Sequence, residues 1–160
     1  MVKSASPSLF ALLIGINEYK SPDLIPLSGA VADVNAVREY LINDIKVPSL
    51  HIRMLRNAEA TRAAIITALQ DFRTDPRIEI GDPILIYYAG HGSATTPPTA
   101  WEAEDSMIQA LVPYDCGTEI HDREVHAIPD RTVGALLSRL ACDKGDNIVR
   151  SIVLSLGSFF

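Results

Sequence analysis

The chain alternates between short runs of apolar residues and segments in which apolar residues recur every three or four positions. Three runs, at residues 9–16, 51–55 and 84–90, have the length and the aliphatic content of strands. A short apolar run that is bounded by glycine, proline or polar residues is typical of a strand buried on both faces of a parallel sheet. Two further runs, at residues 108–112 and 148–156, predict additional strands.

Three segments between these runs have helical spacing. The first covers residues 30–44, the second follows Thr61 as its N-cap and ends at Asp75-Pro76, and the third follows Asp130 as its N-cap. The apolar stripes consist of Val31, Val34, Val37 and Leu41 in the first helix, Ile65, Ala68, Leu69 and Phe72 in the second, and Val133, Leu136, Leu137 and Leu140 in the third.

The order of these elements predicts an α/β fold. Strands and helices alternate along the chain, which favours a mostly parallel sheet with helices on both faces. A dinucleotide-binding domain has the same general order, but the turn after the first strand, Gly15-Ile16-Asn17-Glu18, lacks the glycine triplet that lets a pyrophosphate approach a helix. We therefore set that alternative aside.

Composition narrows the class of protein. The 160 residues suit one domain, and 48% apolar with 21% charged residues is ordinary for a globular protein. A net charge of −6 without a basic cluster argues against nucleic-acid binding. Two cysteines do not make a disulfide framework, so we expect a reducing compartment, the cytoplasm.

Neither end of the chain predicts a membrane segment. Lys3 before the run at residues 9–16 has the outline of a signal peptide, but no small-residue cleavage site follows, and a buried first strand explains the run better. We expect residues 1–8 to be disordered. The apolar segment 148–160 is too short to span a bilayer.

The run at residues 84–90 ends at a histidine, His91, which stands between Gly90 and Gly92. Residues just past the carboxyl end of a parallel strand line the crevice where open α/β sheets bind ligands. We expect the flanking glycines to free His91 for an unusual backbone angle, which would suit proton transfer. On spacing alone, a loop histidine without a function is an equal alternative.

Four stretches in order change that balance: Ala11–Tyr19, Leu27–Val34, Tyr87–Ser93, and Leu111–Asp115 with Ile128-Pro129-Asp130. Together they resemble the motifs of caspase-like cysteine peptidases, in particular metacaspases and fungal caspase-domain proteins. The resemblance runs from about Leu9 to Asn147. It implies a caspase-like three-layer fold for residues 9–147, incomplete at the C-terminus, followed by a divergent apolar tail at residues 148–160.

The resemblance also implies roles for three residues. His91 matches the general acid/base, and the backbone N–H of Gly92 matches a donor of the oxyanion hole. Asp33 matches an acid that holds the basic side chain of an Arg or Lys substrate. Asp33 also has a structural interpretation, because a carboxylate in the first turn of a helix is favoured by the helix dipole.

The family chemistry requires no cofactor, but metacaspases are often calcium-dependent. Asp115 and Asp130 stand in stretches that resemble those carrying calcium-binding acids, so we expect them as candidate ligands. A calcium site needs several oxygens, and the sequence nominates only these two. Asp115 has the alternative of a turn residue, and Asp130 that of a helix cap.

The nucleophile of the family has no counterpart in this sequence. The cysteine should follow the strand that begins near Asn147, but no cysteine stands between there and Phe160. Cys142 precedes that strand and Cys116 lies in an earlier loop, so both are interpreted as structural or incidental thiols. Our hypothesis is that the family likeness breaks after Asn147 because of a truncation.

Two functions stay open. The chain is part of a caspase-type endopeptidase that cuts peptides after Arg or Lys, and is inactive unless another polypeptide supplies the cysteine. Alternatively it is a pseudopeptidase that binds peptides or an intact caspase-like partner. The expected partners are a peptide or protein substrate and such a relative, with no nucleic acid and no membrane. An uncovered strand edge in the apolar tail predicts low solubility or partner binding.

Overall fold

A computed structural model describes residues 8–95 and 107–155. The elements in chain order are β1 (Phe10–Gly15), α1 (Ala30–Asn43), η1 (Ser49–His51), β2 (Ile52–Arg56), η2 (Asn57–Glu59), α2 (Arg62–Thr74), β3 (Ile84–Thr95), β4 (Ile108–Leu111), β5 (Glu119–Ile120), β6 (Arg123–Glu124), β7 (Ile128–Pro129), α3 (Asp130–Lys144) and β8 (Ile148–Ser155). Of the segment expected to be disordered, residues 1–8, only Ser8 is described, and its N–H donates to Asp82 at 3.2 Å. Residues 1–7 and most of the predicted loop at 94–105 lie outside the described residues.

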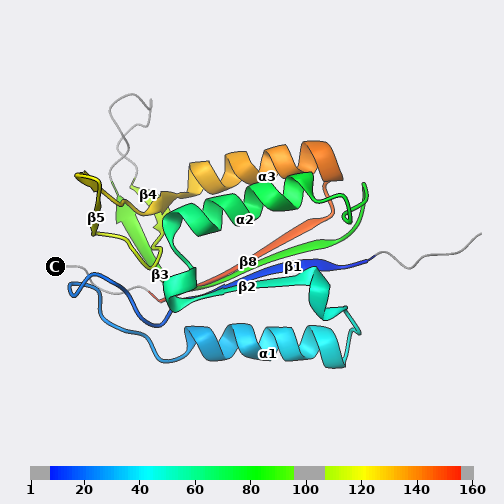
Figure 1. Ribbon diagram of the computed structural model, residues 1–160, viewed down its shortest axis with the longest axis horizontal. Coiled ribbons are helices and arrows are strands. Elements are labelled where there is room, and N and C mark those ends of the chain that lie inside the picture. The colour runs from blue at the N-terminus through cyan, green and yellow to red at the C-terminus, as the bar shows by residue number, and fades with distance from the viewer. Residues whose placement is uncertain (1–7, 96–106, 156–160) are drawn as a thin grey trace, which may run out of the picture.

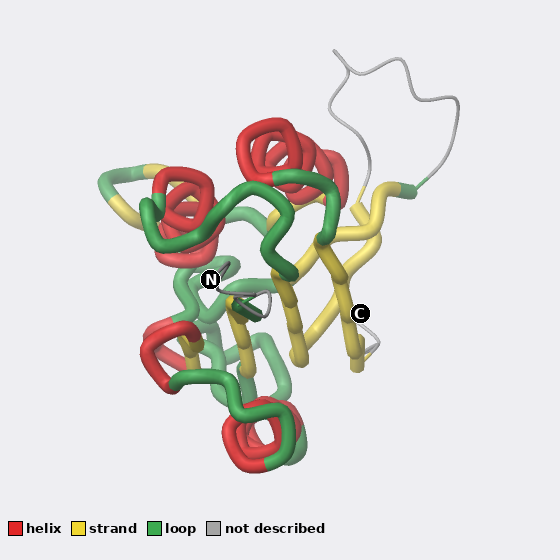
Figure 2. Tube along the Cα trace, turned by 90° about the vertical axis from the view of Figure 1, so that its right-hand side faces the viewer, coloured by secondary structure: helices red, strands yellow, loops and turns green. Residues whose placement is uncertain are grey.

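The centre of the molecule is a curled, mostly parallel sheet. Its parallel part has the order β2-β1-β3-β8, and the end of β3 then pairs antiparallel with β4, which pairs with β7. Helices α2 and α3 lie on one side of this sheet and α1 lies on the other (Figure 1). Seen at a right angle, the strands form the middle layer between the helices (Figure 2). The predicted α/β fold class is confirmed.

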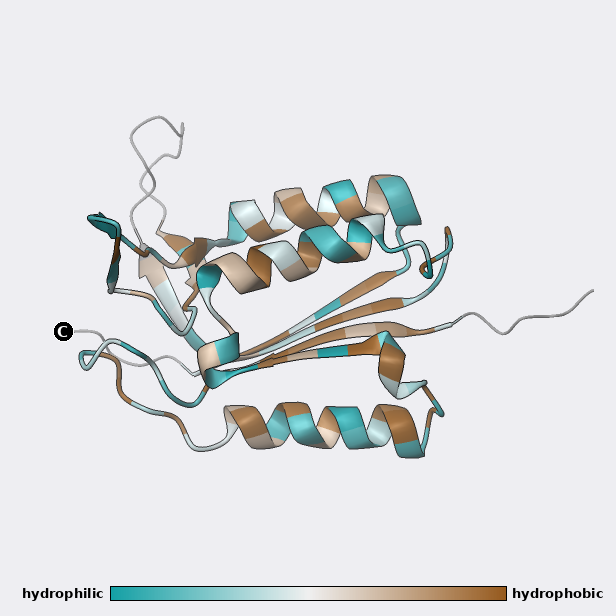
Figure 3. Ribbon diagram, viewed as in Figure 1, coloured by the Kyte–Doolittle hydropathy of each residue, from teal (hydrophilic) through white to brown (hydrophobic). Residues whose placement is uncertain are grey.

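Both faces of the central strands are buried. Leu12 and Ile14 of β1 point into the core below α2 and α3, whereas Ala11 and Leu13 belong to the core against α1. Figure 3 shows the resulting hydrophobic strands between helices of mixed colour. Burial on both sides explains why the strands read as continuous apolar runs and do not alternate with polar residues.

The helix predictions are confirmed except for one cap. The Thr61 hydroxyl accepts a hydrogen bond from the N–H of Ala64 at 3.2 Å, and α2 ends before Asp75. The prediction that Asp130 caps α3 is wrong, because Asp130 is the first helical residue and follows Pro129. Its carboxylate instead accepts a hydrogen bond from Arg150 on β8 at 2.9 Å.

Two predicted loops contain strands. The strand at the histidine does not end there, since β3 continues to Thr95 and pairs with β4. The segment predicted as an exposed loop, residues 116–127, includes the short β5–β6 hairpin. Its two turn residues, His121 and Asp122, have φ angles of 49° and 60°, which is typical of a tight hairpin turn. The tight turn explains how so polar a segment can still pair.

Within residues 8–95 and 107–155, no helix is both long and apolar enough to cross a bilayer.

Candidate functional site

His91 lies where β3 passes from the parallel sheet into the antiparallel one, and its side chain is buried, with 2% exposed. The expectation that His91 takes an unusual backbone angle is wrong, since neither His91 nor its flanking glycines are among the positive-φ residues of the described chain. Close packing around Gly90 and Gly92 explains why these positions are glycine. A Cβ on Gly90 would lie 2.7 Å from the hydroxyl of Tyr88, and one on Gly92 would lie 2.8 Å from a methyl of Leu154.

Two tyrosines hold the backbone of His91. The Tyr88 hydroxyl lies 2.8 Å from the His91 carbonyl and 2.9 Å from the Val112 carbonyl, and its one hydrogen is shared between these two acceptors. The His91 N–H donates to the Tyr19 hydroxyl at 2.8 Å, and the Tyr19 ring packs 5.0 Å from the imidazole. These contacts fix the position of the histidine from β3 itself and from the loop that follows β1.

Burial keeps both hydroxyls protonated. It raises the pKa of Tyr19 to about 12 and the pKa of Tyr88 well above its ordinary value. Both tyrosines belong to motifs that carried the family resemblance, but the sequence assigned them no role. Their position in those motifs was the only signal, because His91, whose N–H donates to Tyr19, lies 72 residues further along the chain.

The imidazole of His91 is held by two carbonyl oxygens. Its Nδ1 lies 3.1 Å from the Ser155 carbonyl on β8, and its Nε2 lies 2.7 Å from the Ile25 carbonyl in the loop before α1. A carbonyl can only accept a hydrogen bond, so both contacts are satisfied together when each ring nitrogen carries a hydrogen. A neutral imidazole carries one ring hydrogen and can donate to only one of the two carbonyls at a time.

Asp33 lies at a cavity next to strand β3. It stands in the first turn of α1 and lines a cavity of about 250 Å³, whose wall also includes Gly90 and Ser155. The pKa of Tyr87 is raised by burial and, to a smaller extent, by the charge of Asp33. The structure therefore brings the exposed Asp33 carboxylate and Gly90, the residue before His91, to the wall of one cavity.

The structure places the two candidate calcium ligands apart. Asp115 is 5% exposed and accepts from the N–H of Arg62 at 2.8 Å, and its carbonyl accepts from Thr118 in a turn. Asp130 lines a different cavity and pairs with Arg150. Within the described part of the chain, no group of three or more His, Cys, Asp or Glu residues could hold a metal ion. Calcium dependence stays a prediction.

Cys116 is near enough to Tyr19 for its charge to act on that hydroxyl, but it is not poised as a nucleophile. Burial, followed by the charge of Asp115, raises the pKa of the Cys116 thiol to about 11, which leaves little thiolate at neutral pH. Cys142 is exposed near the end of α3, where the Lys144 carbonyl accepts from Gly81 just before β3 begins. That is the opposite end of β3 from His91. The residue that faces His91 across the β3–β8 ladder is Ser155.

A histidine on the central strand of a curled parallel sheet, beside an acid-lined cavity, is compatible with a caspase-like peptidase fold. Residues 10–138 match the family model described as metacaspase, peptidase C14 domain. Since this match covers most of the sequence, the chain belongs to the metacaspase family of the peptidase C14 domain. It is therefore a caspase-like peptidase domain.

The chain is also similar in sequence to proteins that are named as carbamate kinases. It is 31% identical over 114 residues to carbamate kinase 2 of Staphylococcus aureus strain Mu50 / ATCC 700699, and equally to that of strain MW2. Each alignment covers 64% of this chain and 36% of the kinase. The chain thus spans about a third of the length of these curated relatives, and the kinase activity in their name stays with them.

A solved structure supports the fold. The crystal structure of protein GSU0716 from Geobacter sulfurreducens superimposes with a TM-score of 0.64 at 20% sequence identity. The likeness covers 91% of this chain and 49% of that one. At this identity the likeness concerns the fold alone.

Proposed function

We propose that this chain carries the histidine half of the site of a caspase-type cysteine endopeptidase that cleaves peptides after Arg or Lys. One observation carries the proposal: a cavity lined by the Asp33 carboxylate shares its wall with Gly90, the residue before His91. A basic side chain seated against Asp33 would place the following peptide bond near the imidazole. Family membership supplies the reaction class, peptide-bond hydrolysis.

Each group has a proposed step in this reaction. A cysteine thiolate attacks the peptide carbonyl carbon, the C–N bond breaks, and the imidazolium of His91 gives its proton to the leaving amine. The N–H of Gly92 is the proposed donor to the oxyanion, a contribution of about 3 kcal/mol in enzymes where it has been measured. Before a proton can be passed, the Ile25 carbonyl must leave Nε2.

The thiolate is the part that these 160 residues do not provide beside His91. Cys116 is held as a thiol by its raised pKa, and Cys142 lies at the far end of β3. We therefore propose that the chain on its own does not turn over peptides, and that activity requires a cysteine from elsewhere.

The same observation favours a second candidate, a pseudopeptidase that binds basic peptides or an intact relative without cleaving them. Both ring nitrogens of His91 already have carbonyl partners, which opposes catalysis. The cavity lined by Asp33 could still hold a basic side chain of a peptide. Binding can therefore exist where catalysis does not.

Binding of two labelled peptides tests the proposed pocket. A fluorescein-labelled tripeptide amide ending in arginine should bind at least about tenfold more tightly than its citrulline counterpart, which has the same shape and no charge. The Asp33→Asn variant should lose this preference, and Asp23→Asn, in the exposed part of the preceding loop, should keep it. Equal affinity for the two peptides in the unchanged chain would contradict the pocket.

Turnover of an arginyl-coumarin amide separates the two candidates. Release of coumarin that disappears in His91→Ala would establish the enzyme and overturn the proposal that the chain alone is inactive. Arginine-selective binding without release supports the pseudopeptidase for the chain in isolation. Adding an intact caspase-like relative then tests whether the chain changes that enzyme's rate.

A further inference from the structure

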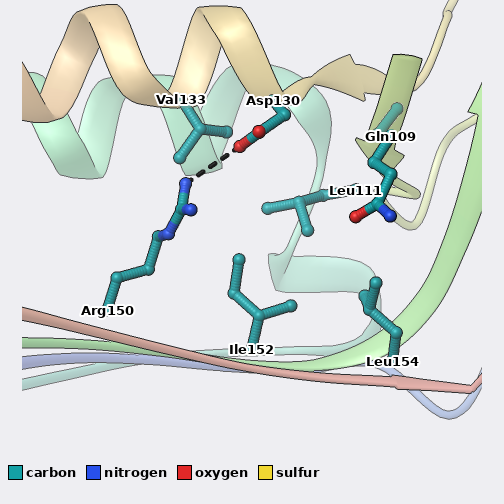
Figure 4. Close-up of a pocket in the computed structure, with 8 residues that line it drawn as sticks. Gln109, Leu111, Asp130, Val133, Arg150, Ile152 and Leu154 are labelled. Carbon is teal, nitrogen blue, oxygen red and sulfur yellow. Dashed lines mark hydrogen bonds and ion pairs between the residues drawn. The ribbon is translucent and has the colours of Figure 1, made fainter. Parts of the chain in front are cut away.

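Two cavities lie against β8, one on each face of the sheet, and each has one acid in its wall. Between α3 and β8, Asp130 lines a cavity of about 300 Å³, and its carboxylate pairs with Arg150 at 2.9 Å (Figure 4). Beside α1, Asp33 lines the cavity of about 250 Å³. Among residues 8–95 and 107–155, the Asp33 carboxylate has no ion-pair or hydrogen-bond partner. Of these two acids, only Asp33 offers an uncompensated charge to a ligand.

The two tyrosine hydroxyls of β3 show a similar contrast. The Tyr88 hydroxyl lies within 2.9 Å of two carbonyl oxygens. The Tyr87 hydroxyl, one residue earlier, makes no hydrogen bond within the part of the chain that the structure describes. The fold itself therefore uses the hydroxyl of Tyr88 and leaves that of Tyr87 to a ligand.

Tyr87 lies on the face of β3 that carries the Asp33 cavity. Tyr87 and Ala89 both pack on the core against α1, and Ala89 lines the cavity. Two residues of a strand span roughly 7 Å, so Tyr87 is the next residue on this face beyond the cavity wall. The charge of Asp33 also reaches the Tyr87 hydroxyl, since it contributes, after burial, to the raised pKa of that group. The carboxylate and the hydroxyl therefore lie within electrostatic reach of each other on one side of the sheet.

We propose that Tyr87 determines the specificity of the pocket at Asp33, so that the pocket takes arginine in preference to lysine. This inference rests on the proposed function, in which Asp33 holds a basic side chain of the substrate. The guanidinium pairs with the Asp33 carboxylate, and the Tyr87 hydroxyl oxygen accepts a further hydrogen bond from it.

The shapes of the two basic side chains explain the preference. A guanidinium is planar and carries five N–H donors, and a carboxylate engages two of them along one edge. Three donors then remain, and they point away from the carboxylate toward a second acceptor. The lysine ammonium is a compact point charge, so it has no such edge to present to Tyr87 once it is paired with Asp33.

The partial burial of Tyr87 suits this role. Its ring packs on the core beneath α1, which fixes the position of the side chain, and the residue is still partly exposed. No hydrogen bond of the described chain has to break before the hydroxyl accepts one from a substrate. The variant Tyr87→Phe keeps the ring and its packing, and therefore isolates the contribution of the hydroxyl.

Binding of three labelled peptides to the full chain tests the role of Tyr87. The probes are fluorescein-labelled tripeptide amides that differ only in their last residue, which is arginine, lysine or citrulline. We expect the arginine peptide to bind about tenfold more tightly than the lysine peptide, the factor that a hydrogen bond to a charged group supplies. Tyr87→Phe should weaken binding of the arginine peptide by about tenfold and that of the lysine peptide by less than about twofold. Asp33→Asn should weaken binding of both.

Two controls accompany these measurements. Tyr40→Phe removes a hydroxyl from α1 about two turns beyond Asp33, on a residue that is 56% exposed, and should leave all three affinities unchanged. Urea denaturation of Tyr87→Phe should match that of the unchanged chain, because the deleted hydroxyl has no partner within the described residues. A change in peptide affinity without a change in stability then assigns the hydroxyl to the substrate and not to the fold.

The outcomes distinguish this inference from the proposed pocket. Equal affinity of the unchanged chain for the arginine and citrulline peptides removes the pocket and this inference together. A preference for arginine over citrulline, with equal affinity for arginine and lysine, keeps the pocket and overturns the role of Tyr87. An arginine-over-lysine ratio that survives in Tyr87→Phe also overturns that role.

Discussion

The two sides of His91 are held by very different parts of the molecule. Its backbone is fixed by the hydroxyls of Tyr19 and Tyr88, and Tyr88 is fully buried in the core. Its ring is held by the carbonyl of edge strand β8 and by that of Ile25, whose side chain is 69% exposed. The position of the histidine is thus set by packing, whereas the contacts of its ring depend on a loop and an edge.

The position of His91 and the accessibility of its ring nitrogens are therefore controlled by different contacts. A core contact moves only when the domain unfolds, but a loop contact can open at a much smaller free energy. The site therefore keeps the histidine in place while leaving Nε2 within reach of a change in the loop. Mutations that disrupt the backbone contacts of His91 should therefore differ in their effect on stability from mutations that disrupt its ring contacts.

The largest effect is expected from Gly90→Ala. The new Cβ would meet the Tyr88 hydroxyl at 2.7 Å and the Tyr19 hydroxyl at 3.1 Å, so both tyrosines must shift. Overpacking of this kind costs about 3 kcal/mol, measured as the free energy of unfolding in urea. Gly134→Ala is the matched control, because nothing lies within 4 Å of its added Cβ and alanine favours helix α3. Similar stability for the two variants would show that the tyrosine side is not rigid.

A smaller effect is expected from His91→Phe, which keeps the ring and removes both ring nitrogens. The Ile25 and Ser155 carbonyls then lose their partner, and we expect a loss of about 2 kcal/mol. Amide hydrogen exchange should speed up in residues 21–28 and stay slow in β1. Uniform acceleration across the domain would mean that the loop is no looser than the core.

The smallest effect is expected at alkaline pH. Burial raises the pKa of Tyr19 to about 12 from 10.0, so the unfolded chain loses this proton first as the pH rises. The contribution of Tyr19 to the free energy of unfolding should therefore be complete below pH 10 and be lost between pH 10 and about 12. We expect this loss to be roughly 1 kcal/mol, because the ring is only partly buried.

The variant Tyr19→Phe identifies the group responsible for the alkaline loss. It should lose less stability over this pH range than the unchanged chain in parallel urea titrations. Tyr40→Phe, with a side chain at 56% exposure on α1, is the control. An identical alkaline loss of stability in Tyr19→Phe and the unchanged chain would show that Tyr19 is not the group responsible.

The elements with local causes could be predicted from the sequence. Thr61 caps α2 through an N–H three residues away, and the stripe from Ile65 to Phe72 follows from helical periodicity. The identity of the strands followed from their continuous apolar runs. The place of Asp33 in the first turn of a helix followed from the same patterns, whereas His91, predicted to lie just past the end of its strand, lies within β3.

The remaining features depend on contacts that no local pattern contains. Glycine at position 90 reads as conformational freedom, but it is required by the Tyr88 hydroxyl that folds back beside it. The loop carbonyl of Ile25 has no side-chain signature at all. Asp130 looked like a cap, and only the arrival of β8 shows that its carboxylate faces Arg150.

The partners of His91 also determine when its surroundings can form. Tyr19, Ile25 and Ser155 lie 72, 66 and 64 residues away along the chain. Contacts between such distant residues require large loops to close before any stabilising contact is made, and topologies rich in them fold slowly. The strands on either side of β3 come from opposite ends of the sequence, so β3 cannot find both neighbours until nearly the whole domain has been synthesised. The geometry around the histidine is therefore among the last products of folding.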